Sequence, residues 1–133
     1  MFGHVFIHTA SNDEPLEQFA SLLFERLGIT RFHERESSNY VEGFYFLGTA
    51  FGIEGALAYA DEQGLPDYRF WLSIEPVQHG APGGDYLHQH ALSLAALLST
   101  FGWRTFVPND FCTVAGDHEG TVFPANSNAT GNV

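Results

Sequence analysis

The order of helix-like and strand-like stretches constrains this chain more than any other feature. Apolar residues recur at helical spacing near residues 16–27 and 85–101. Four strand-like runs lie between these stretches and are joined by short connections, and they cover residues near 29–36, 40–50, 52–61 and 67–75. Short connections favour antiparallel neighbours, because a parallel pair needs a long crossover. The sequence therefore predicts an antiparallel sheet accompanied by two helices.

Local signals predict where the first helix begins and ends. The residues "SNDE" offer Ser11 or Asn12 as the N-terminal cap, and Pro15 then falls in a first turn, where proline is tolerated. Gly28 stands where a left-handed residue commonly ends a helix. The apolar stripe predicted to face the core comprises Leu16, Phe19, Ala20, Leu23, Phe24 and Leu27.

A second helix is predicted between Asp85, which can cap it, and Gly102, which can end it. Its apolar stripe comprises Leu87, Ala91, Leu94, Leu98 and Phe101. Further strands are predicted at 4–10 and 103–107, where apolar and polar residues alternate. We expect an α+β fold, with a single, largely antiparallel sheet of five to six strands, two helices packed on one face and the other face partly open.

The domain organisation expected from the pattern is simple. Residues 1–123 form a single α+β domain, and residues 124–133 form a polar C-terminal tail without periodicity. Within the domain, charge falls on both faces of the run at 29–36, with Arg31, His33 and Arg35 opposite Phe32, Glu34 and Glu36. Charge on both faces is typical of an edge strand, where it blocks unwanted pairing.

The charge balance limits the classes of partner. The sequence contains sixteen acidic residues, five arginines and no lysine, so the formal net charge is −11. A field of that sign repels nucleic acid and anionic membranes and attracts basic partners, although solubility alone also explains an acidic surface. Cys112 is the only cysteine, so an intramolecular disulfide is excluded. No signal peptide or membrane span is expected, and a cytoplasmic location follows.

Catalytic and metal-binding patterns are not expected to carry the function. His88 and His90 are two residues apart in a predicted helix and point in different directions, while His4 and His8 are about 13 Å apart along a strand. A metal site built from distant loops by His79, His118 and Asp117 remains open. Cys112 lacks a predicted helix N-terminus behind it to lower its pKa. We expect neither a catalytic residue nor a cofactor.

Two surfaces remain as candidate sites. The first is acidic and aromatic, and it suits a basic protein surface because acids speed encounter and aromatic rings anchor a complex. Its members are Glu34, Glu36, Tyr40, Glu42, Asp61, Glu62, Asp67 and Tyr68. The second is a basic and aromatic patch on the open sheet face, suited to a carboxylate ligand and to a small-ligand-binding or enzymatic role. Its members are Arg31, His33, Arg35, Arg69 and Trp71.

The stretch "RESSNYVEGFYFLGTAFGIEGALAYADEQGLPDYRFWLSI", residues 35–74, resembles segments of small bacterial proteins of uncharacterised or toxin-immunity type. The resemblance covers about a third of the chain and implies no particular fold. It implies a cytoplasmic, non-enzymatic protein whose acids cover the basic surface of a cognate toxin. We therefore expect an immunity protein, with the ligand-binding patch as the alternative and a structural subunit of an assembly as a third possibility.

Overall fold

Seven strands and two helices make up the described part of the computed structural model. The structure describes the following residues: 3–10, 13–30, 32–35, 43–46, 53–60, 67–76, 85–109 and 119–125. The elements in chain order are β1 (Gly3–His8), α1 (Leu16–Leu27), β2 (Phe32–Arg35), β3 (Gly43–Phe46), β4 (Ile53–Tyr59), β5 (Phe70–Pro76), α2 (Asp85–Thr100), β6 (Arg104–Pro108) and β7 (Gly120–Phe123).

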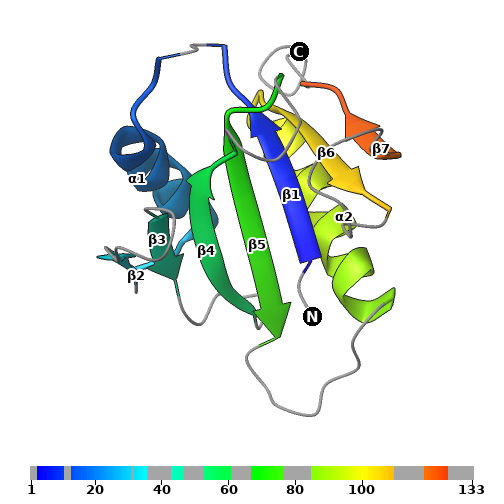
Figure 1. Cartoon of the computed structure of the whole chain (residues 1–133), viewed down its shortest axis with the longest axis horizontal. Coiled ribbons are helices and arrows are strands. Elements are labelled where there is room, and N and C mark those ends of the chain that lie inside the picture. Colours follow the sequence, from blue (N-terminus) through cyan, green and yellow to red (C-terminus); the bar gives the residue numbers. More distant parts are fainter. Residues whose placement is uncertain are drawn as a thin grey trace.

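The strands form one sheet in the order β2-β3-β4-β5-β1-β6-β7, and every neighbouring pair is antiparallel. Strands β2 to β5 follow one another as a meander, and β1 is inserted between β5 and β6. Figure 1 shows the sheet in front, with both helices behind it. The predicted α+β class is confirmed.

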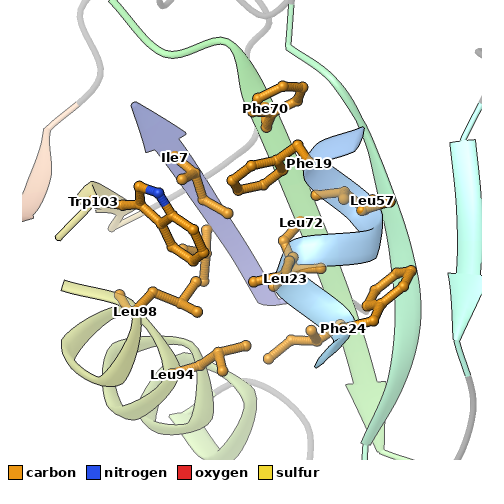
Figure 2. Packing of buried hydrophobic residues seen from close by; sticks show 14 of the residues in the cluster. Ile7, Phe19, Leu23, Phe24, Leu57, Phe70, Leu72, Leu94, Leu98 and Trp103 are labelled. Atoms are coloured by element: carbon orange, nitrogen blue, oxygen red, sulfur yellow. The ribbon is translucent and has the colours of Figure 1, made fainter. Parts of the chain in front are cut away.

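The main core lies between the sheet and the two helices. Alternation along β1 and β5 directs Val5, Ile7 and Leu72 toward the helices, and all three are fully buried. Figure 2 shows Phe19 of α1 between Phe70 of β5 and Trp103. The ring of Phe19 stacks on Phe70, with centroids 4.2 Å apart, and meets Trp103 edge-on at 5.0 Å. These aromatic contacts join α1 to the sheet.

The start of α1 differs from the sequence prediction. The helix begins at Leu16, and Pro15 is an extended N-cap residue that makes no side-chain cap hydrogen bond. The predicted caps Ser11 and Asn12 lie outside the described residues. The backbone N–H of Leu16 instead donates to the hydroxyl of Tyr59 on β4, at 2.7 Å. A residue distant in sequence therefore satisfies an N–H group that the first turn leaves without an intrahelical acceptor.

Replacing Tyr59 with phenylalanine removes this acceptor and keeps the ring. We expect the free energy of unfolding to fall by about 1 kcal/mol, because the Leu16 N–H loses its partner in a part-buried site. Urea unfolding measures the change. Ser21→Ala is the matched control, since the exposed Ser21 hydroxyl bonds only the Glu17 carbonyl of its own helix. Equal stability of the two variants would contradict this role for Tyr59.

The two helices end as predicted. Gly28 has a φ of 71°, and it and Ile29 donate backbone hydrogen bonds to the carbonyls of Glu25 and Phe24. This pairing closes the last turn of α1 in the pattern that a left-handed residue permits. Gly102 follows the end of α2, and its N–H donates to the Ser99 carbonyl.

One edge strand of the described sheet was predicted from the sequence, and the other was not. Strand β2 lies at one edge of the described sheet, as its charge pattern predicts. The other edge is β7, which was not predicted and makes the described sheet seven strands rather than five to six. Within β7, only the last residue, Phe123, packs against the main core, as a partly buried side chain. The sequence of β7 therefore shows little of the apolar alternation that predicts a strand.

Candidate functional site

The predicted acidic surface is described at only a few of its positions. Glu34 lies in β2, of which the structure gives the backbone at that position, and Asp67 and Tyr68 precede β5. The remaining members lie outside the described residues, and these are Glu36, Tyr40, Glu42, Asp61 and Glu62. Asp67 and Tyr68 are therefore the two residues of this surface whose surroundings can be analysed.

Residues of β1 and β6 contact Asp67 and Tyr68 and fix their positions. The Nδ1–H of His8 on β1 donates to the backbone carbonyl of Asp67 at 2.8 Å, and Asp67 itself is exposed. The ring of Tyr68 is half-buried and packs against Phe106 of β6, with centroids 5.8 Å apart. The guanidinium of Arg104 lies 5.4 Å from the centre of the Tyr68 ring. The position of an exposed acid beside an anchored aromatic ring is thus fixed by β1 and β6.

The hydroxyl of Tyr68 stays protonated over the physiological pH range. Burial raises the pKa of Tyr68 above its ordinary value, and the charge of Arg104 opposes that rise in part. Tyr68 can therefore act as a neutral hydrogen-bond donor or as an apolar anchor.

The described residues of the predicted basic and aromatic patch lie on two separate strands and on the segment before β5. His33 and Arg35 belong to β2, and β3 and β4 separate β2 from β5. Three strand spacings place the backbone of β2 about 14 Å from that of β5. Arg31 lies outside the described residues.

Arg69 and Trp71 also face different surroundings. The Nε–H of Arg69 donates to the Glu14 carbonyl at 2.8 Å, and its guanidinium lies 5.0 Å from the centre of the Tyr59 ring. These contacts attach it to the segment before α1. Trp71 lies on the sheet face opposite the helices, where its Nε1–H donates to Nδ1 of His4 at 3.0 Å. The two residues therefore do not form a shared ligand site.

The face opposite the helices carries a second cluster, which we call the sheet-face cluster. Its members share one face of the sheet because Phe6 of β1 lies directly opposite Trp71 of β5 on one side and opposite Phe106 of β6 on the other. Phe6 is fully buried, so this part of the face is covered rather than open as expected. The cluster comprises His4, Phe6, Tyr68, Trp71, Arg104 and Phe106.

Arg104 and His8 were absent from the predicted sites. A signal for both was present in the sequence, since "HVFIH" and "WRTFV" each alternate and carry a polar residue on the same face as a phenylalanine. Only the strand pairing shows that His8 lies directly opposite Arg104. Sequence alone does not give that register.

Burial in the sheet-face cluster lowers the pKa of His4 from 6.5 to about 4. The neutral ring accepts the Trp71 hydrogen bond through Nδ1, which a protonated ring cannot do. The unfolded chain binds a proton near pH 6.5, and the folded protein binds it only near pH 4. His4 thus contributes stability that is complete above pH 6.5 and is lost as the pH falls toward 4.

We expect this loss to amount to about 2–3 kcal/mol across that window, after allowance for the partial exposure of the ring. Urea unfolding at a series of pH values measures it. His4→Asn is the matched variant, because its side-chain oxygen can accept the Trp71 hydrogen bond but does not titrate. Wild-type and variant stability curves of identical shape between pH 4 and 6.5 would contradict the assignment.

Metal binding finds no support among the described residues, which contain no group of three or more His, Cys, Asp or Glu able to hold an ion. His4 and His8 have separate partners, Trp71 and the Asp67 carbonyl. The loop residues His79, Asp117 and His118 lie outside the described part, as does Cys112.

Comparisons with known proteins give no relative from which a function could be transferred. No protein-family model, curated protein sequence or solved structure matches this chain. Within the part of the chain that the structure describes, neither helix is long and apolar enough to cross a membrane. Functional inference therefore depends on the charge and contacts of the chain's own residues.

Proposed function

We propose that this protein is a non-enzymatic binding protein that neutralises a basic protein partner, in the manner of immunity proteins that occlude a toxin surface. The observation that carries the proposal is the net charge of −11 in a chain without lysine. Charge of this size accelerates encounter with a cationic surface and disfavours anionic partners.

The contacts of the arginines strengthen this electrostatic argument. The three arginines whose side chains the structure describes pack on aromatic rings of the protein itself, Arg26 on Trp103, Arg69 on Tyr59 and Arg104 on Tyr68. Arg26 and Arg69 also donate to backbone carbonyls. Exposed acids of the described part include Glu17, Glu25, Asp67 and Glu119. Because positive charge is engaged in internal contacts, the surface offered to a partner is dominated by carboxylates.

Asp67 and Tyr68 are the described residues best suited to contact such a partner. Asp67 is exposed, and the hydrogen bond from His8 holds its backbone in place. A carboxylate on an ordered backbone loses less conformational entropy on binding than one on a free loop. Tyr68 offers a half-buried ring beside it, and tyrosine is common among the residues that dominate binding energy.

The test is a binding measurement with the purified product of the adjacent gene. Asp67→Asn removes one charge at the proposed contact, and Glu17→Gln removes one charge from the exposed face of α1. We expect Asp67→Asn to weaken binding about tenfold or more, and Glu17→Gln to weaken it less than about threefold. Equal effects of the two variants would overturn the placement at Asp67, and no binding by the wild-type protein would overturn this choice of partner.

A further inference from the structure

Arg104 differs from Arg26 and Arg69, the other arginines with described side chains, in how its N–H groups are used. Arg26 donates from Nη1 to the Phe101 carbonyl at 3.1 Å, and Arg69 donates from Nε to the Glu14 carbonyl at 2.8 Å. The Nε of Arg104 is buried and has no hydrogen-bond partner among the residues that the structure describes. A buried N–H donor without an acceptor is unfavourable, so this Nε–H is suited to an acceptor that a ligand supplies.

The contact with Tyr68 leaves the donor edge of Arg104 suited to an acceptor. The guanidinium lies over the Tyr68 ring, 5.4 Å from its centre. The planar guanidinium carries five N–H donors arranged as a fork, which a contact with one ring does not use up. The Tyr68 hydroxyl also lies within hydrogen-bonding reach of the Arg104 side chain. One hydroxyl cannot satisfy a planar fork of five N–H donors.

His8 provides a second polar group at the same place. It pairs with Arg104 across β1 and β6, so the two side chains leave the sheet on the same face. Its Nδ1–H is used by the Asp67 carbonyl at 2.8 Å, and this bond fixes the ring. The second ring nitrogen, Nε2, accepts a hydrogen bond when the ring is neutral and donates one when it is protonated.

We propose that Arg104, with His8 opposite, receives the carboxylate group of a bound molecule. A carboxylate matches the planar fork with two parallel hydrogen bonds and supplies the acceptor that Nε lacks. The net charge of −11 disfavours the greater charge of a phosphate. Arg104 is partly exposed as a residue, so part of its side chain is accessible to a ligand. The site adjoins Asp67 and Tyr68, the proposed contact with a basic protein, but its ligand chemistry does not rest on that proposal.

Arginine side-chain NMR on the wild-type protein tests the proposal directly. Acetate is titrated against sodium chloride of the same ionic strength, and the Nε–H resonances of the arginines are followed. We expect a saturable shift at Arg104, while Arg26 and Arg69, whose N–H groups already have carbonyl acceptors, serve as internal controls. A shift at Arg104 that does not saturate, or that all three arginines share, would overturn the site.

Two further probes separate the possible sources of the carboxylate. Triglycine carries a free C-terminal carboxylate, and triglycine amide lacks it. Saturation by triglycine at lower concentration than by acetate assigns the site to a peptide C-terminus, whereas equal concentrations assign it to small carboxylic acids. The His8 ring signals of the wild-type protein should also shift saturably when acetate is added. In Arg104→Lys the charge remains but the fork is lost, so this His8 shift should disappear. Its persistence in this variant would assign the ligand to His8 alone and reject the role of Arg104.

Discussion

Replacing Phe19 with alanine is expected to lower the free energy of unfolding by about 3–5 kcal/mol. Phe19 is fully buried and is the residue through which α1 meets both Phe70 and Trp103. Its loss removes a stacked pair and an edge contact and leaves a cavity between the helix and the sheet (Figure 2). Denaturant unfolding followed by the near-ultraviolet circular dichroism of the aromatic side chains measures the effect.

Phe19→Leu is the matched variant for this experiment. Leucine keeps the site apolar and most of its volume but abolishes ring stacking, so a smaller loss of about 1.5 kcal/mol is expected. Losses of equal size in the two variants would mean that the aromatic contacts matter more than the filled volume. A loss below about 1 kcal/mol for alanine would contradict the packing of α1 on β5.

Replacing Gly55 with alanine is expected to cost about 3 kcal/mol or to prevent folding. Gly55 lies on β4 opposite Ile74 of β5, and a Cβ atom there would overlap the main-chain oxygen of Ser73. Backbone atoms cannot rotate away as a side chain can, so the two strands would have to separate. Thermal unfolding of the purified variant measures the cost.

Gly28→Ala provides the comparison for this substitution. Gly28 has a φ of 71°, and nothing lies within 4 Å of an added Cβ. The cost there is backbone strain alone, about 1–2 kcal/mol. If Gly55→Ala were no more harmful than Gly28→Ala, the close approach of β4 to β5 would be wrong.

The fold was predictable where the sequence carries periodic apolar residues or glycine at a helix end. Local sequence determines three of these features, namely the alternation in β1 and β5, the apolar stripe of α1 and the end of α1 at Gly28. The start of α1 was mispredicted because its first N–H is satisfied by Tyr59, a residue on β4. Such a contact exists only after the sheet has formed, so local capping rules could not find it.

The candidate sites were less predictable than the fold, because they depend on strand order. Arg69 and Trp71 are two residues apart, so strand alternation predicts that their side chains lie on the same face. In the structure, Arg69 donates to the Glu14 carbonyl, whereas Trp71 donates to His4. Conversely, Arg104 and His8 are distant in sequence and become neighbours through the pairing of β1 with β6. Residue composition predicts a basic partner and leaves open which side chains lie together, because that depends on the register of the strands.

The salt dependence of binding to the purified product of the adjacent gene tests the central claim most directly. Affinity is measured at about 0.05 M and about 0.5 M sodium chloride, which shortens the screening length from more than 10 Å to less than 8 Å. An acidic protein that neutralises a basic partner should bind at low salt and lose most of its affinity at high salt. An affinity that does not change with salt, or a partner that is itself neutral or acidic, would contradict the account.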